Sequence, residues 1–94
     1  MKFEITDKTG RKIHLSSERW EHICEHKEMN KYLEEIKETL SYPLKIVQHK
    51  EGELYDYYNY YKHRKSKNKF LKVVVKYLNG DGFVLSAYFV PYVN

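Results

Sequence analysis

The chain has 94 residues, a formal net charge of +4 and a hydrophobic content of 41%, which is ordinary for a globular protein and argues against intrinsic disorder. Its length predicts a single domain over residues 1–94 with a modest core. A single cysteine excludes an internal disulfide framework and a four-cysteine zinc site. No apolar run approaches the roughly 18 residues of a membrane span, and the N-terminus lacks the apolar stretch of a signal peptide. We therefore expect a cytoplasmic protein without a membrane partner.

The chain is predicted to begin with a hairpin and a helix. Residues 2–6 and 11–15 have the pattern of short strands around a turn at residues 7–10. Ser16 or Ser17 is the expected cap of the first helix, because a serine hydroxyl accepts a hydrogen bond from a free backbone N–H group. The apolar stripe of this helix is expected to comprise Trp20, Ile23 and Cys24.

A second helix and two strands are predicted next. Asn30 is the expected cap of this helix, which ends before Pro43 because proline disfavours helix in the preceding residue. Residues 44–49 and 54–61 are predicted strands joined by a turn at residues 50–53. The buried stripe of the helix is expected to comprise Leu33, Ile36 and Leu40.

Residues 70–90 predict a β-hairpin around which the other elements can be arranged. Its two runs alternate on either side of residues 79–82, which tolerate positive φ. A two- or four-residue loop would place Lys72 and Lys76 on an apolar surface, so we predict a three- or five-residue loop with a glycine bulge in the turn. The expected apolar face comprises Leu71, Val73, Val75, Tyr77, Phe83, Leu85, Ala87 and Phe89.

The predicted order is two strands, two helices and four strands. This order predicts an α+β fold, ββ-αα-ββββ, with two N-terminal helices packed on one face of an antiparallel β-sheet. The opposite face, which carries the polar side of the hairpin, is expected to stay partly open. The strand at residues 54–61 lacks clean alternation, so its faces are left unassigned.

Positive charge is concentrated in the second half of the chain. Residues 1–47 contain nine cations and nine acids, whereas residues 48–94 contain eight cations and four acids. A basic loop at residues 62–69 follows a strand rich in tyrosine, a combination that suits phosphate contacts and base stacking. A solvated loop beside a self-packed strand explains the composition equally well. The candidate RNA-binding residues are Arg64, Lys65, Lys67, Lys69, Tyr58 and Tyr60.

His22 and His26 lie four residues apart, which predicts that both are on one side of the first helix. Imidazole groups titrate near neutral pH and serve as general acids and bases, although two surface histidines without a role are the commoner case. The same segment fits the H-x-x-E-H zinc-protease pattern. We reject a zinc centre because so small a chain lacks a third ligand and a substrate cleft, which leaves only adventitious zinc or nickel binding.

Polar side chains of the hairpin are the other candidates for chemistry. Lys72 and Lys76 are expected on one strand face, where cations can stabilise a phosphorane transition state. Ser86 and Tyr88 are expected on the same face and could donate hydrogen bonds to phosphate, or be ordinary sheet-surface residues. The chain has no glycine-rich nucleotide loop and no acidic cluster for two-metal catalysis, so we expect no cofactor.

Several segments together resemble one family. The run IHLSSERWEHICEHKEM, the helix YLEEIKETL, the tyrosine-rich strand, LKVVVKYL and FVLSAYF resemble the phage-type RNases of the barnase, EndoU, colicin and RelE-like group. The resemblance implies a metal-independent endoribonuclease of the toxin or effector type, which cleaves RNA by attack of the 2′-hydroxyl on the adjacent phosphate. It implies RNA such as tRNA or mRNA as substrate, and a cognate antitoxin or immunity protein as partner. The catalytic candidates that it implies are His22, His26, Lys72, Lys76, Ser86 and Tyr88.

Two other classes of function fit the same sequence. A non-catalytic RNA-binding module would use the same basic and aromatic surface. A protein-interaction domain would dock through the tyrosine-rich strand as a free sheet edge. Cleavage of RNA in the presence of a chelator separates the enzyme from both alternatives.

Overall fold

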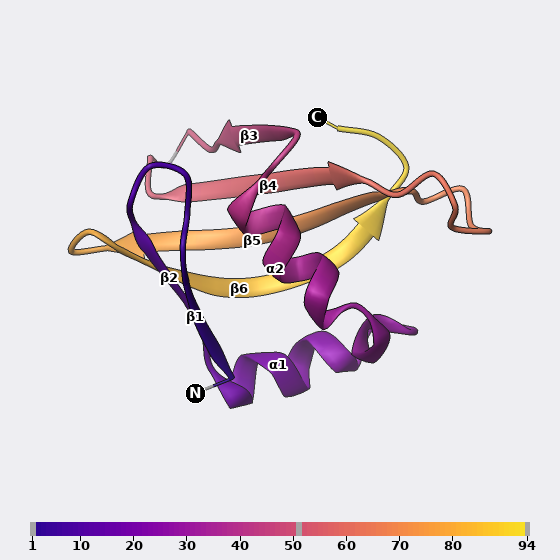
Figure 1. The fold of residues 1–94 in the computed structure, drawn as a ribbon, viewed down its shortest axis with the longest axis horizontal. Helices are drawn as coiled ribbons and strands as arrows, with labels where there is room; N and C mark the ends of the chain where they lie inside the picture. The colour runs from indigo at the N-terminus through magenta and orange to yellow at the C-terminus, as the bar shows by residue number, and fades with distance from the viewer. Residues whose placement is uncertain (1, 51, 94) are drawn as a thin grey trace.

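The computed structural model describes residues 2–50 and 52–93, which form a six-stranded mixed sheet with two α-helices (Figure 1). The predicted α+β class is confirmed, and the elements follow roughly the predicted order. The first half contains β1 (Phe3–Thr6), β2 (Lys12–Leu15), α1 (Ser17–Cys24), a 3-10 turn (Met29–Lys31) and α2 (Leu33–Ser41). The second half contains β3 (Lys45–Gln48), β4 (Leu54–Tyr60), β5 (Phe70–Leu78) and β6 (Asp81–Val90).

The strands are arranged in the order β1-β2-β6-β5-β4-β3. All neighbouring strands are antiparallel except β2 and β6, which pair in parallel through Ile13 with Gly82 and His14 with Phe83. The expectation of a wholly antiparallel sheet is therefore wrong. Both helices and three strands separate β2 from β6, so no tight hairpin fixes their relative direction. Because β4 pairs with β3 and β5, the tyrosine-rich strand is not a free sheet edge.

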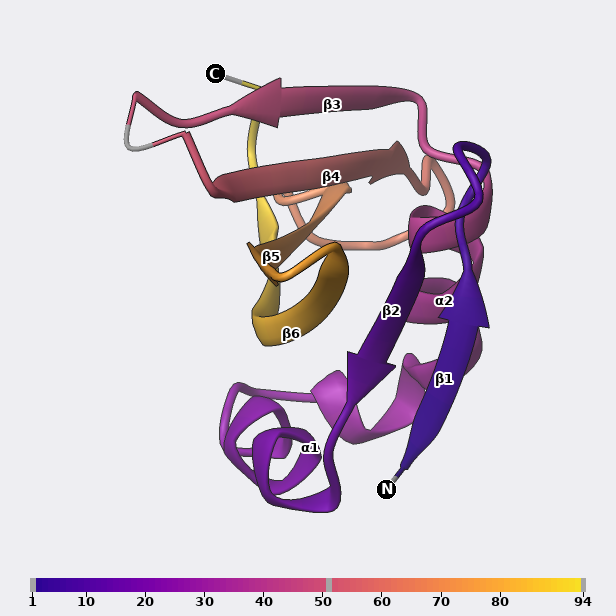
Figure 2. The ribbon, with the colours of Figure 1, turned by 90° about the vertical axis from the view of Figure 1, so that its left-hand side faces the viewer.

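The sheet bends so that β1 and β2 lie on the same side of it as α2 (Figure 2). Helix α2 contacts β5, β1 and β4, while α1 lies against β6. Burial of apolar side chains at this junction is the main stabilising term of the fold. Trp20 and Leu33 pack at the margin of the core, as does Phe89. The buried apolar residues that form the core include Ile13, Leu15, Ile23, Met29, Ile36, Leu40, Tyr57, Leu71, Val73, Val75, Val84 and Ala87.

The two helices begin differently from each other. Ser16 caps α1, and its hydroxyl accepts a hydrogen bond of 3.1 Å from the backbone N–H of Arg19, as predicted. Asn30 does not cap α2, because it lies inside the 3-10 turn that precedes the helix. The buried side chain of Met29 anchors this turn in the core, and α2 therefore starts two residues after the turn ends. Helix α1 ends at Cys24, so His26 lies in the following loop.

The β5–β6 hairpin has a two-residue turn, not the predicted longer loop. Leu78 pairs with Asp81, and the turn residues Asn79 and Gly80 have φ values of 53° and 88°. Positive φ at both positions matches the twist of the strands, which explains the preference for this tight turn. A bulge then shifts the register between Val74 and Val75. The bulge therefore lies within the strands, whereas the prediction placed it in the turn.

The bulge changes which residues of β6 face the core. Beyond it Leu71 pairs with Phe89 and Val73 with Ala87, as the predicted register requires. Nearer the turn, Val84 is buried, whereas Phe83 is 39% exposed and lies opposite Lys76. The prediction that Phe83 is in the core is therefore wrong, and Leu85 is only partly buried.

A buried hydrogen-bond network ties the β1–β2 hairpin to the sheet. The Asp7 carboxylate accepts hydrogen bonds from the hydroxyl groups of Thr9, Tyr57 and Tyr77, and from the backbone N–H of Arg11. The two tyrosine hydroxyls also lie within hydrogen-bond distance of each other, so they can share their protons between Asp7 and one another. Asp7 is 7% exposed, so its charge is stabilised by these donors and not by bulk water.

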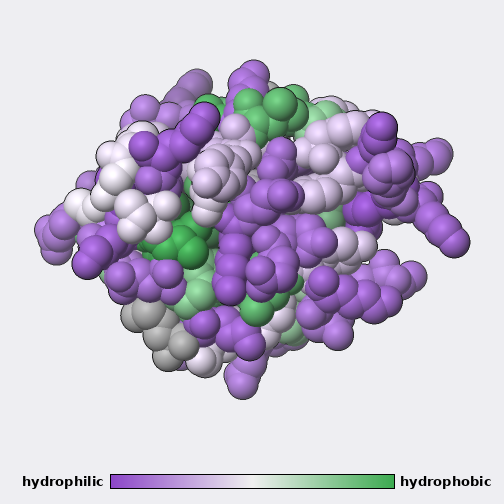
Figure 3. Space-filling view, viewed as in Figure 1, coloured by the Kyte–Doolittle hydropathy of each residue, from purple (hydrophilic) through white to green (hydrophobic). Residues whose placement is uncertain are grey.

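The helix-bearing face of the molecule is mainly hydrophilic, and apolar atoms reach it only in small separate areas (Figure 3). Within residues 2–50 and 52–93, no helix has the length and apolar composition needed to cross a bilayer. The backbone reverses direction between β3 and β4 around Gly52, although Glu51 of the predicted turn lies outside the described residues.

Candidate active site on the open sheet face

The candidate site is the face of β4–β6 that points away from α2. Because successive residues of a strand point to opposite faces, the cross-strand pairs determine what this face contains. One row places Tyr58, Lys72 and Tyr88 side by side. The adjacent row contains Asp56, Val74 and Ser86. A cation, a carboxylate and hydroxyl groups are thus concentrated on one sheet surface.

Asp56 is the centre of the charged cluster. It is 4% exposed, and its Oδ2 lies 3.5 Å from Nζ of Lys72 and 2.9 Å from Nε2 of His49. Its other carboxylate oxygen, Oδ1, is buried without a hydrogen-bond partner among the residues that the structure describes. A buried carboxylate oxygen without a donor is costly, and such groups are concentrated at functional sites.

Lys72 remains charged in this environment. Burial alone lowers the pKa of its ammonium group, but the negative charge of Asp56 opposes that effect. Together with Tyr58 and Tyr88, Asp56 raises the pKa of Lys72 above its ordinary value. The side chain is 14% exposed, so the structure offers a fixed cation that still reaches the surface.

Tyr88 connects this cluster with the loop after α1. Nζ of Lys72 lies 5.6 Å from the centre of the Tyr88 ring. The centre of the His26 imidazole ring lies 5.5 Å from the centre of the same Tyr88 ring. An accessible imidazole, a phenol and a cation therefore follow one another across the edge of β6.

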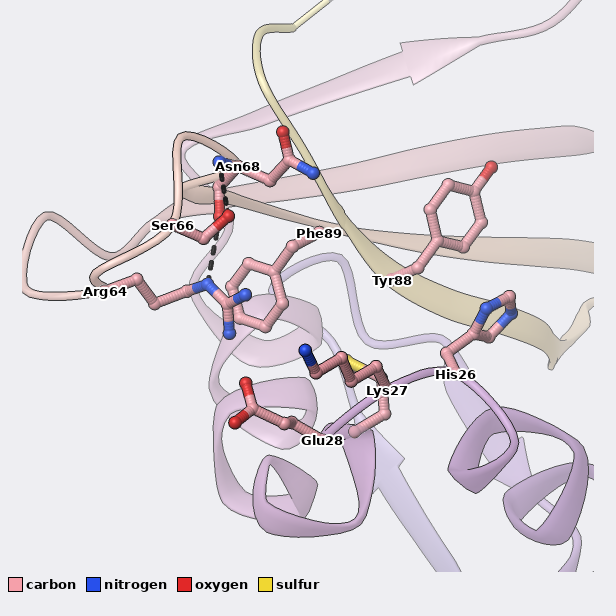
Figure 4. A pocket seen from close by; sticks show the side chains of 9 residues that line it. His26, Lys27, Glu28, Arg64, Ser66, Asn68, Tyr88 and Phe89 are labelled. Atoms are coloured by element: carbon pink, nitrogen blue, oxygen red, sulfur yellow. Dashed lines mark hydrogen bonds between the residues drawn. The ribbon is translucent and has the colours of Figure 1, made fainter.

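A pocket of about 370 Å³ opens beside His26 and Tyr88. Figure 4 shows its walls, which come from the loop after α1, the basic loop before β5 and the end of β6. Met29 forms part of the wall in addition to the labelled side chains. The labelled residues that line it are His26, Lys27, Glu28, Arg64, Ser66, Asn68, Tyr88 and Phe89.

The structure brings together some of the predicted catalytic residues and separates others. His26, Lys72 and Tyr88 form the continuous series described above. Lys76 and Ser86 share the open face, with Lys76 opposite Phe83 and Ser86 opposite Val74. His22 lies apart on α1 with a side chain that is 58% exposed, and its charged neighbour is Glu25 at 3.8 Å.

The predicted RNA-binding residues also divide into two groups. Arg64 lines the pocket, whereas Lys65 and Lys67 are exposed on the basic loop and Lys69 donates a hydrogen bond to the Arg64 carbonyl. Tyr60 is 47% exposed and packs on Phe70. Tyr58 is fully buried, so the expectation that its ring stacks on a base is wrong.

Sequence analysis missed Asp56 and His49. Asp56 is the only acid between Glu53 and Asp81, which is a usable signal within a strongly basic and aromatic segment. Its face could not be read, because tyrosines occupy both sides of β4 and remove the alternation. His49 reaches Asp56 because it follows β3 directly and its backbone N–H bonds to the Leu54 carbonyl.

Within the part of the chain that the structure describes, no group of three or more histidine, cysteine or acidic residues could hold a metal ion. No protein-family model matches the chain, and no curated protein or solved structure is significantly similar to it. The site therefore has to be judged on its own geometry and charge.

Proposed function

We propose that the protein is an endoribonuclease that binds single-stranded RNA on the open sheet face and cleaves it without a metal ion. The observation that carries this proposal is the series His26, Tyr88, Lys72 and Asp56 across β6, β5 and β4. It combines an accessible base, a hydroxyl donor and a buried ion pair that holds a cation in place.

In the proposed reaction, His26 accepts the proton of the substrate 2′-hydroxyl. The 2′-oxygen then forms a bond to phosphorus while the bond from phosphorus to the 5′-oxygen breaks. The products are a 2′,3′-cyclic phosphate and a 5′-hydroxyl. This step needs no oxidant, reductant or co-substrate.

The other residues of the series have separate roles in this reaction. The Tyr88 hydroxyl donates a proton to the leaving 5′-oxygen, and the ammonium group of Lys72 stabilises the resulting phenolate. Lys72 also stabilises the charge that develops on the non-bridging oxygens. Asp56 is a positioning residue, because it is almost fully buried and acts through its contacts with Lys72 and His49. His49 contacts the same carboxylate oxygen as Lys72, Oδ2 of Asp56, and helps to hold it in place.

The test is incubation of the purified protein with single-stranded RNA in a chelator, followed by analysis of the product ends. Cleavage with 2′,3′-cyclic phosphate ends supports the proposal. The Lys72→Gln variant should cleave about 10²–10³-fold more slowly, which is the usual effect of removing one group that stabilises transition-state charge. Binding without cleavage would contradict the proposal and indicate the non-catalytic RNA-binding module instead.

A further inference from the structure

Most of the residues that line the pocket beside His26 have no part in the proposed cleavage chemistry. Its lining combines two permanent cations, Lys27 and Arg64, with one acid, Glu28. Ser66 and Asn68 add a hydroxyl and an amide that can donate hydrogen bonds. The pocket therefore has an excess of positive charge and of donors, which is the chemistry that recognises an anion.

Arg64 is held in a fixed position at this pocket. Its guanidinium carbon lies 3.6 Å from the centre of the Phe89 ring and 5.2 Å from that of Tyr32. Its Nε donates a hydrogen bond of 2.9 Å to the Asn68 carbonyl. In Figure 4 the rest of the guanidinium group projects from the loop towards Lys27 and Glu28. These contacts restrict the side chain before any ligand binds, which reduces the entropy lost on binding.

The loop facing Arg64 is also held in an unusual conformation. Glu28 has a φ of 66°, a value that costs free energy in a residue with a side chain. Such conformations are retained where the surrounding structure enforces them, often at ligand sites. Here the strained residue places Lys27 and Glu28 on one wall of the pocket.

We infer that this pocket binds the phosphate group next to the scissile one in single-stranded RNA. The inference rests on the proposed function, because His26 and Tyr88 line the pocket and also belong to the proposed catalytic series. A chain bound across Tyr88 would continue from Lys72 into the pocket. Its volume of about 370 Å³ lies within the range of small-ligand sites, so it has room for a sugar as well as for the phosphate.

Binding of uncleavable DNA analogues tests this inference separately from catalysis. The probes are a 2′-deoxy dinucleotide with one phosphodiester and a 2′-deoxy trinucleotide with two, both titrated in chelator by calorimetry. The trinucleotide should bind about tenfold more tightly, since its second phosphate gains charge-assisted hydrogen bonds. Arg64→Gln and Lys27→Gln should each remove most of this advantage, while Glu28→Gln should increase it.

Lys8→Gln is the matched control, because Lys8 is an exposed cation on the β1–β2 turn and its replacement changes the charge equally. The advantage of the trinucleotide should survive in this variant. Lys27 is itself exposed, so Lys27→Gln keeps the test valid even where the loss of Arg64 packing perturbs the fold. If the trinucleotide keeps its full affinity advantage over the dinucleotide in both Arg64→Gln and Lys27→Gln, the inference is overturned, even if the protein cleaves RNA. A pocket-dependent advantage in a protein that cleaves no RNA would uphold the phosphate site and reject the proposed nuclease.

Discussion

The Lys72 ammonium group lies 3.5 Å from the carboxylate of Asp56, a residue that is almost fully buried in β4. The two residues are on adjacent strands, one row apart, with Asp56 opposite Val74 and Lys72 opposite Tyr58. Neither charge would be favourable alone at this depth. Their pairing therefore explains how a cation is kept in place on the open sheet face.

The pair predicts a non-additive effect on stability. Asp56→Asn should lower the free energy of unfolding by about 1–3 kcal/mol, because Lys72 then loses its charged partner. Lys72→Met should lower the unfolding free energy less in the Asp56→Asn variant than in the unmodified protein, because in that variant it removes an unpaired ammonium group. Urea denaturation of the four proteins measures this coupling. Additive losses would show that the two charges do not interact significantly.

The buried tyrosine network predicts a second effect on stability. Tyr57→Phe removes the hydroxyl that bonds to Asp7 and Tyr77, and should cost about 1–3 kcal/mol of unfolding free energy. Tyr60→Phe is the matched control, because Tyr60 is exposed on the same strand. It should change stability by less than about 0.5 kcal/mol. Equal effects of the two substitutions in thermal or chemical denaturation would contradict the network's role.

Asp7 predicts a specific loss of stability in acid. Burial alone raises its pKa, but hydrogen bonds from Thr9, Arg11 and Tyr57 outweigh this and lower the pKa below the ordinary value of 3.8. Protonation then favours the unfolded chain, so the stabilisation is present above the ordinary pKa and is lost as the pH falls through the folded-state value. The unfolding free energy of the unmodified protein should fall more steeply below about pH 4 than that of Asp7→Asn. Parallel pH curves for the two proteins would contradict this assignment.

Gly82 predicts a packing defect where β6 pairs with β5. A Cβ atom there would lie 2.9 Å from Cε1 of Tyr77 and 3.0 Å from Cγ1 of Val75. Gly82→Ala should therefore destabilise the fold by about 1–3 kcal/mol through overpacking. Chemical denaturation measures the loss. A variant as stable as the unmodified protein would mean that the side chains of Tyr77 and Val75 can move aside at little cost.

The sequence predicts the elements of this fold better than their pairing. Alternation along residues 70–78 places Val73 and Val75 in the core, because period two is unbroken there. On β6 the bulge changes the phase, so the same rule wrongly buries Phe83. A bulge depends on the fit of both strands to the core and turn, and single-strand periodicity does not contain that information.

The candidate site was predicted in part for similar reasons. Lys72 and Tyr88 both lie beyond the bulge, where the predicted register holds, so their shared face was predicted correctly. His22 and His26 are four residues apart, but α1 ends between them, and only His26 contacts Tyr88. Asp56 needs the β4–β5 register to be linked to Lys72, because the two are 16 positions apart in the chain. Long-range pairing of this kind is set by the whole sheet.

The most direct test of the proposed nuclease compares the two histidines. Cleavage of single-stranded RNA in chelator is measured for the unmodified protein, for His26→Gln and for His22→Gln. We expect His26→Gln to lower the rate about 10²–10⁴-fold, the range for loss of general acid–base catalysis, with product ends of the cyclic phosphate type. His22→Gln should retain the full rate, because His22 lies outside the site. Equal rates for all three proteins, or no cleavage by the unmodified protein, would contradict the proposed function.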